Sequence, residues 1–196
     1  MVRNVVKYGH PVLRQKGARV ERITAAIKAL VEDLIETMYA AKGLGLAAQQ
    51  IGEPVQVTVV DVRALDRPST LEWAGKPVNA ADFMPMVLIN PEIKPFGERV
   101  SGPEGCLSFP EIFADISRPD FAEVTALNRK GERVAFRCSG LLSRVIQHEV
   151  DHLNGILFID RMDAPTKSGL KPQLAELQAS TKEELKKPGG ADKPKD

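Results

Sequence analysis

The stretch GLLSRVIQHEVDHL, residues 140–153, sets the plan for the rest of the chain. Its apolar positions recur at the three- and four-residue spacings of an α-helix, so the pattern predicts a helix over 140–153. These positions are Leu141, Leu142, Val145, Ile146, Val150 and Leu153. They cover a wide arc of the helix, which is typical of a central element buried by its neighbours.

Within this helix, the residues from His148 to His152 read H-E-V-D-H, which matches the pattern H-E-x-x-H. The two histidines fall one turn apart on the same face, so both imidazoles can reach one metal ion. Glu149 lies about 100° further around the helix, which can place its carboxylate beside a metal-bound water. The alternative is a pair of histidines satisfied within the core, and the intervening glutamate favours the functional interpretation.

A catalytic zinc-type site usually has three protein ligands, so the two histidines need a third. The candidates are His10, Cys106, Cys138 and a carboxylate. Cys106 stands out because it follows a glycine in EGCLS, residues 104–108, and glycine lets backbone approach closely. Cys138 is more typical of a small buried apolar residue, and His10 of a surface turn.

The segment GLGLAAQQ, residues 43–50, is small, apolar and punctuated by glycine. It is not a phosphate loop, because no Gly-Lys-Ser/Thr follows. One interpretation is a helix end followed by a tight turn under the core. The other is a backbone edge open to an extended peptide, with an amide side chain that donates to a developing oxyanion.

Outside these motifs, we predict a helix from an apolar stripe at residues 27–38, with Thr24 as its N-cap and Gly43 as the left-handed residue at its end. Strands are expected at 55–62 and 86–89, and 122–127 with 132–136 are expected to form a hairpin. Residues 63–85 lack sustained periodicity and predict a long surface excursion. Helices and strands are segregated, so we expect an α+β fold of antiparallel β-sheets packed around the central H-E-x-x-H helix.

The chain of 196 residues is long enough for one domain with a sizeable core. A net charge of +1 is too small to steer the molecule onto nucleic acid or an anionic membrane. Only two cysteines occur, and the start resembles no leader, so we expect a cytoplasmic protein. No apolar run approaches the roughly 20 residues of a membrane-spanning helix.

We expect one catalytic domain over residues 1–165 and a polar tail over 166–196. The tail predicts a peripheral helix at 172–187 and a frayed end at 187–196. The lysines between residues 167 and 195 could contact the ribosome surface, but a solvated charged tail is the favoured interpretation.

Taken in order, the segments 43–50, 104–108 and 148–152 resemble the three signature motifs of the peptide deformylase family. The resemblance extends from Leu13-Arg14 to about Asp160 and includes Ile89-Asn90-Pro91 and Leu153-Asn154-Gly155. It implies a metal-dependent hydrolase that removes the formyl group from the N-terminal formyl-methionine of nascent polypeptides.

The resemblance also assigns roles to single residues. The implied metal ligands are Cys106, His148 and His152, with Glu149 as the catalytic acid/base. Gln50 and the backbone N–H of Leu107 would bind the oxyanion, Gly45 and Leu44 would contact the substrate, and Glu104 would support the ligands from behind. Gln49 occupies a variable position. The implied cofactor is one divalent ion, with iron(II) favoured by the family, although zinc, nickel or cobalt also suits these ligands.

Two alternatives stay open at this level. A zincin endopeptidase shares H-E-x-x-H but usually takes its third ligand from histidine or glutamate. A purely structural metal would be closed by four protein ligands and would leave no position for water. No membrane partner and no sequence-specific nucleic acid is expected.

Overall fold

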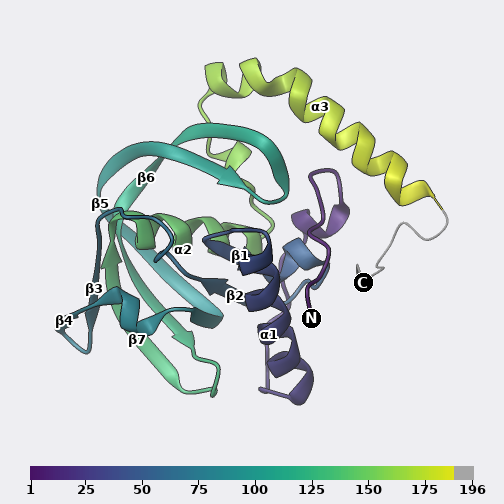
Figure 1. The fold of residues 1–196 in the computed structure, drawn as a ribbon. Helices are drawn as coiled ribbons and strands as arrows, with labels where there is room; N and C mark the ends of the chain where they lie inside the picture. The colour runs from purple at the N-terminus through teal and green to yellow at the C-terminus, as the bar shows by residue number, and fades with distance from the viewer. Residues whose placement is uncertain (188–196) are drawn as a thin grey trace.

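Seven strands form one continuous sheet in the computed structural model, which describes residues 1–187. The strands are β1 Gly45–Ala47, β2 Val57–Val60, β3 Ser69–Trp73, β4 Lys76–Val78, β5 Met86–Cys106, β6 Phe109–Leu127 and β7 Arg133–Ser139. Their order is β1-β2-β5-β6-β7-β3-β4, and each named pair is antiparallel. The α+β class with antiparallel pairing is therefore confirmed, with a single sheet in place of the expected several (Figure 1).

Three α-helices accompany the sheet: α1 Ala25–Ala40, α2 Gly140–Leu153 and α3 Ala164–Lys186. Helix α2 has the bounds expected from its periodicity, and all residues from Val145 to Leu153 are buried. Its polar residues are buried together with its apolar ones, so the H-E-x-x-H side chains lie in the interior of the protein.

Alternation along β2 and β5 places α1 and α2 on opposite faces of the sheet. Val60 and Leu88 belong to the hydrophobic cluster that includes Leu142 and Ile146 of α2. Val59 and Ile89 belong to the cluster around α1. Because successive strand residues point to opposite faces, each strand contributes to both clusters. Both faces of this part of the sheet are thus covered by a helix.

Helix α1 begins as expected, but its end differs from the prediction. The Thr24 side chain accepts a hydrogen bond from the Ile27 N–H at 3.3 Å. At the other end Lys42, and not Gly43, adopts the left-handed conformation, with φ 55°. The Gly43 N–H then donates to the Met38 carbonyl at 2.9 Å, which closes the last turn in the manner of a Schellman motif.

The surface excursion predicted for residues 63–85 is wrong, because this segment extends the sheet. It folds into β3, β4 and the short helix η3, Ala80–Phe83, and β3 pairs with β7. Trp73 stacks against Phe136 with ring centroids 5.4 Å apart and contacts Phe83 at 4.7 Å. Aromatic packing therefore fixes a segment whose polar and proline-rich composition suggested a loop.

Strands β5 and β6 run far beyond the predicted segments and pair with each other as a long ribbon. Figure 1 shows this ribbon curving across the molecule above α2. Its middle is largely exposed, so it lacks the apolar alternation that would have revealed it. The predicted hairpin of β6 and β7 is present, with residues 128–132 as its turn.

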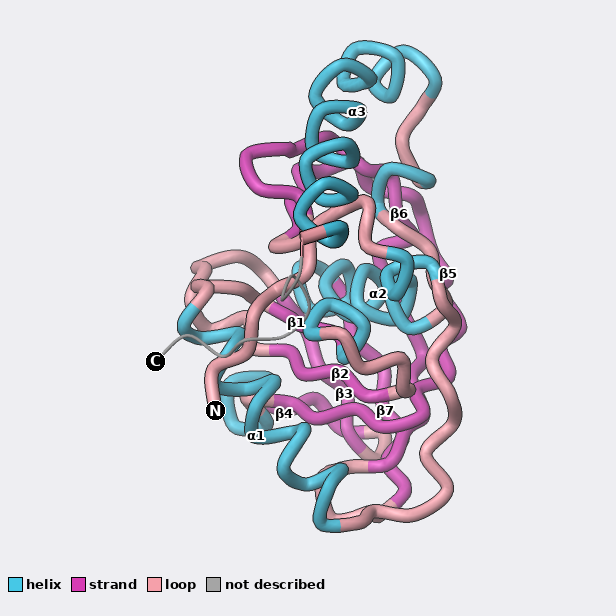
Figure 2. Tube along the Cα trace, turned by 90° about the vertical axis from the view of Figure 1, so that its right-hand side faces the viewer, coloured by secondary structure: helices cyan, strands magenta, loops and turns pink. Residues whose placement is uncertain are grey.

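Helix α3 starts earlier than the predicted 172–187, because the Asp163 side chain caps it by accepting from the Thr166 N–H at 2.8 Å. Leu170, Leu174 and Leu177 pack against a cluster that includes Phe109 and Phe158. Figures 1 and 2 both place α3 at the end of the molecule away from α1. Of the predicted frayed end, residues 188–196 lie outside the described residues. Within residues 1–187, no helix is long and apolar enough to cross a membrane.

Candidate metal centre

The three sequence motifs converge at the start of β1, the end of β5 and the second half of α2. Cys106 ends β5, pairs with Phe109 and leaves Leu107 and Ser108 as a tight turn. One donor atom each from Cys106, His148 and His152 falls within 4.8 Å of the others. These are the only three such residues that the structure, over residues 1–187, brings together in this way.

The donor atoms leave room for one small ion. Cys106 Sγ lies 3.2 Å from His152 Nε2, and the two imidazole centroids are 5.0 Å apart. His148 Nδ1 lies 3.0 Å from Glu104 Oε2, so its other ring nitrogen, Nε2, is the one left for a ligand. Both histidines are buried and Cys106 is half-buried.

The other candidate ligands lie elsewhere. Cys138 is buried in β7, where its thiol faces the Ala122 carbonyl at 3.8 Å. Burial raises the pKa of this thiol to about 12, which keeps it protonated and inert. His10 caps a short 3-10 helix, its Nδ1 accepting from the Val12 N–H at 3.2 Å.

A chain of buried ion pairs holds His148 from behind. Glu104 accepts from Arg118 Nε at 2.6 Å and from Arg144 Nη1 at 2.9 Å, besides its contact with His148. Arg118 also donates to Asp151 Oδ2 at 2.8 Å. Sequence reasoning found Glu104 but missed Arg118, Arg144 and Asp151. The only available signal was that Asp151 lies inside the H-E-x-x-H motif.

These contacts shift the pKa values of the buried groups in opposite directions. For Glu104, burial alone would raise the pKa, but His148 and Arg118 together lower it to about 2. For His148, burial alone would lower the pKa, but Cys106 and Glu104 raise it well above its usual value. Burial and the neighbouring His148 lower the pKa of His152 well below its usual value. Glu104 is therefore an anion within the site, whereas the His152 imidazole is neutral.

Glu149 differs from Glu104 although both are buried. Its Oε2 has no hydrogen-bond partner in the described part of the chain. Burial raises its pKa to about 7, against the opposing effects of His148 and Arg118. A nearby cation would lower that pKa again. A carboxylate with a free oxygen and a pKa near neutrality is suited to proton transfer.

Gln50 and Gly45 complete the wall opposite α2. The Gln50 Nε2 lies 3.4 Å from both Cys106 Sγ and Ser108 Oγ, while its Oε1 accepts from the Ala47 N–H at 2.9 Å. The orientation of this amide thus directs its N–H groups toward the cysteine. A Cβ on Gly45 would lie 2.6 Å from Glu149 Oε1, so only glycine leaves space for that carboxylate.

The remaining motif residues lie close by. A Cβ on Gly43 would lie 2.9 Å from a methyl carbon of Leu107, which brings the first and second motifs into contact. The Leu44 carbonyl accepts from the Asp61 N–H at 2.8 Å, which extends the pairing of β1 with β2. Gln49 points the other way, donating to the Leu153 carbonyl at 3.2 Å.

The residues present fit a divalent metal ion. The Glu149 Oε2 is buried without a hydrogen-bond partner in residues 1–187, so the site is incomplete with protein groups alone. One thiol and two imidazoles match the donors that zinc-type and ferrous ions select. Three donors leave further positions for water and substrate.

An α+β domain in which a buried H-E-x-x-H helix supplies two such donors and a strand end supplies the third belongs to the class of metal-dependent hydrolases. The family model described as polypeptide deformylase matches residues 2–168. The peptide deformylase of Opitutus terrae is 44% identical over 180 residues, covering 91% of this chain and 94% of that protein. The peptide deformylase of Aquifex aeolicus is 40% identical over 162 residues, covering 83% and 88%. The chain belongs to the polypeptide deformylase family.

Solved structures agree with this assignment. Peptide deformylase 1B of Arabidopsis thaliana, crystallised with an inhibitor, has a TM-score of 0.79 and 35% identity, covering 94% of this chain and 95% of that one. A peptide deformylase from Synechococcus elongatus in complex with actinonin has a TM-score of 0.71 and 35% identity, covering 91% and 85%.

Proposed function

We propose that this member of the family removes the formyl group from the N-terminal formyl-methionine of newly made polypeptides and releases formate. Family membership supports the reaction. The observation in the site that carries it is the buried Glu149 carboxylate, which lies between His148 and His152 in the sequence and has one oxygen without a hydrogen-bond partner in residues 1–187. The chemistry is hydrolysis of an amide bond.

One divalent ion held by Cys106, His148 and His152 would supply Lewis acidity and make a water nucleophilic near neutral pH. We assign iron(II) to this position from the family resemblance. Zinc, nickel and cobalt also suit one thiolate with two imidazoles. The Glu104 carboxylate supports this ligand set, because its contact with His148 Nδ1 fixes the ring orientation.

In the proposed reaction, Glu149 accepts a proton from the attacking water as that water bonds to the formyl carbon. The bond between the formyl carbon and the methionine nitrogen then breaks, and Glu149 returns the proton to the departing amine. Formate and a free N-terminal amine result. The Oε2 without a hydrogen-bond partner in residues 1–187 is available to accept this proton, and burial, which raises the pKa of Glu149, helps the side chain to hold the proton until it returns it.

Gln50 and Leu107 are the proposed oxyanion donors. The Gln50 Nε2 faces the Cys106 side of the site, and Leu107 follows Cys106 in the turn. N–H groups placed where negative charge develops stabilise the transition state more than the ground state. Gly45 and Leu44 are the proposed substrate contacts, because β1 is an outer strand of the sheet whose backbone can pair with an extended peptide.

The domain division is part of the same proposal. Residues 1–165 would form the catalytic unit and 166–196 an appendage, in keeping with a family match that ends at residue 168. The cytoplasm, where nascent chains emerge, is the proposed place of action. Any contact with the ribosome would fall on the exposed lysines of α3, among them Lys171 and Lys182.

The test is formate release from a formyl-Met peptide by protein purified without air, with metal content measured in the same sample. We expect rapid hydrolysis of the formylated peptide and far slower hydrolysis of its acetylated counterpart, because a pocket built around a formyl hydrogen excludes the added methyl group. Cleavage of internal peptide bonds would instead indicate an endopeptidase. Comparable kcat/KM for the two acyl groups would contradict the proposed substrate.

A further inference from the structure

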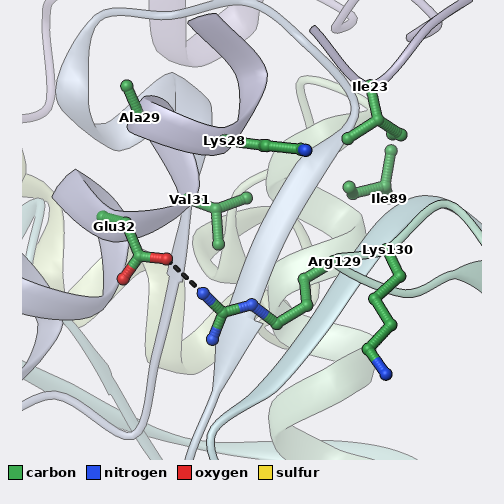
Figure 3. A pocket seen from close by; sticks show the side chains of 8 residues that line it. All are labelled: Ile23, Lys28, Ala29, Val31, Glu32, Ile89, Arg129 and Lys130. Atoms are coloured by element: carbon green, nitrogen blue, oxygen red, sulfur yellow. Dashed lines mark hydrogen bonds and ion pairs between the residues drawn. The ribbon is translucent and has the colours of Figure 1, made fainter. Parts of the chain in front are cut away.

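A hollow lies on the α1 side of the sheet, and the proposed reaction makes no use of it. Its volume is about 500 Å³, and it lies between the first turns of α1, strand β5 and the turn that joins β6 to β7 (Figure 3). This volume falls within the range of small-molecule sites, roughly 300–1,000 Å³. Its location on the face opposite α2 separates it from Cys106, His148 and His152.

The floor of this pocket is apolar and rigid. Val31 and Ile89 are 2% and 0% exposed, so they form a surface that the core already holds in place. Ile23 closes one side, where a Cβ on Gly131 would come within 3.1 Å of its Cγ1. The apolar surface open to an occupant is therefore that of Ile23 and the aliphatic parts of Lys28 and Arg129.

The wall is also fixed before any ligand arrives. The Asn128 Oδ1 accepts from the Lys130 N–H at 2.9 Å and from the Glu132 N–H at 3.0 Å, which sets the turn between β6 and β7. Arg129 of that turn is ion-paired with Glu32 of α1, as the dashed line in Figure 3 shows. A preformed pocket of this kind loses little conformational entropy on binding.

The charge of the lining is unbalanced. Three cations, Lys28, Arg129 and Lys130, face one acid, Glu32. Glu32 pairs with Arg129, and neither lysine has a carboxylate within salt-bridge distance among residues 1–187. In Figure 3 the Lys28 side chain runs across the hollow and points its ammonium toward Ile23 and Ile89, whereas the Lys130 ammonium points away. Lys28 is thus a cation directed at an apolar surface.

We propose that this pocket binds a small amphipathic anion, namely a carboxylate with an aliphatic body, with Lys28 as its charge partner and Ile23 and the aliphatic part of Arg129 as its apolar contacts. The carboxylate of the ligand would pair with the Lys28 ammonium and balance the excess positive charge of the lining. A charge-assisted hydrogen bond of this kind is stronger than one between neutral groups. The aliphatic body of the ligand covers Ile23. Lys130 adds attraction from the rim.

Octanoate is the probe, measured on the full chain by calorimetry and by its displacement of the fluorescent anion anilinonaphthalenesulfonate. We expect saturable one-to-one binding that weakens as salt is added. Lys28→Met should weaken it by roughly tenfold or more, whereas Lys28→Arg should retain it, because charge-assisted contacts carry at least that much affinity. Ala29→Phe, which adds a bulky side chain at the edge of the hollow, should weaken binding.

Lys171→Met on α3 is the matched control, since it removes the same charge from an exposed position at the other end of the molecule. It should bind octanoate like the wild type. Hydrolysis of a formyl-Met peptide should be unchanged by octanoate and by all four variants. Absence of saturable binding, equal affinity in Lys28→Met, or competitive inhibition by octanoate would each overturn the proposal.

Discussion

Two buried glutamates, Glu104 and Glu149, show how neighbouring residues give the same side chain different chemistry. Glu104 contacts Arg118, Arg144 and His148. Burial alone would raise its pKa, but His148 and Arg118 lower it to about 2, so Glu104 is a permanent anion. Glu149 keeps one oxygen without a partner in residues 1–187, and burial raises its pKa to about 7. The first is built to hold a ligand in place and the second to exchange a proton.

The variant Glu149→Gln tests this division at the residue scale. The amide keeps the shape of the side chain but cannot accept a proton, so kcat/KM for a formyl-Met peptide should fall by roughly 10²- to 10⁴-fold. Metal content should stay near that of the wild type. Cys106→Ala should instead lose metal and activity together, because two histidines alone coordinate the ion incompletely. Metal loss in Glu149→Gln, or near-normal turnover with the metal retained, would show that Glu149 is not the base.

Gly45→Ala is a second residue-scale prediction, made on steric grounds. The added Cβ would lie 2.6 Å from Glu149 Oε1 and 2.8 Å from Glu149 Cδ, so the carboxylate must move. We expect at least a roughly tenfold loss of kcat with metal content unchanged, since a misplaced base transfers protons poorly. Gly169→Ala, in α3 with nothing within 4 Å of the new Cβ and no left-handed backbone, is the control for an added methyl group. Unchanged kcat in Gly45→Ala would refute a positional role for Gly45.

At the scale of elements, the ion pairs join α2 to the β5–β6 ribbon. Arg118 of β6 bridges Glu104 of β5 and Asp151 of α2 with buried contacts of 2.6–2.9 Å. Arg144 of α2 reaches back to the Val100 and Ile116 carbonyls, both at 2.7 Å. These contacts position the strand end that carries Cys106 against the helix that carries both histidines.

Removal of Arg118 should therefore damage both stability and metal binding. Arg118→Ala leaves the Glu104 and Asp151 carboxylates without this partner, which should lower the free energy of unfolding by roughly 3–5 kcal/mol. Loss of the support behind His148 should weaken metal affinity by about 10- to 100-fold. Arg161→Ala, which removes a half-exposed partner of Asp151, should cost about 1 kcal/mol or less. Urea unfolding and metal titration of both variants provide the measurement, and equal effects would contradict this ranking.

Sequence patterns predicted the elements that are buried along most of their length. Strand β2 is buried throughout and helix α2 over most of its length, and their β-branched composition or periodicity was visible. The hairpin of β3 and β4 was not, because its strands are short and its stability comes from Trp73 stacking on distant Phe136. The motif positions 106, 148 and 152 were available from family resemblance. Arg118 was not, because nothing local marks an arginine whose partners lie in two other elements.

At the scale of the whole molecule, α3 is attached through one side only. Leu174 is 7% exposed, and Leu170 and Leu177 pack partly against the cluster that contains Phe109 and Phe158. The same cluster includes Cys106 at its edge, and the Phe158 ring lies 6.1 Å from the His148 ring. Helix α3 thus covers the far side of the core that supports the site without reaching the donor atoms.

A chain that ends at Pro165 tests whether the domain division is correct. Loss of α3 exposes the apolar surface beneath Leu170, Leu174 and Leu177, so the free energy of unfolding should fall by roughly 2–4 kcal/mol. The value of kcat/KM per folded molecule should stay within about twofold, because no donor atom, base or oxyanion donor is removed. Leu174→Ala in the full chain should reproduce part of the stability loss, and Lys182→Ala, on the exposed side of α3, should not. A large fall in kcat/KM at a temperature where circular dichroism shows the shortened chain fully folded would place α3 within the catalytic unit.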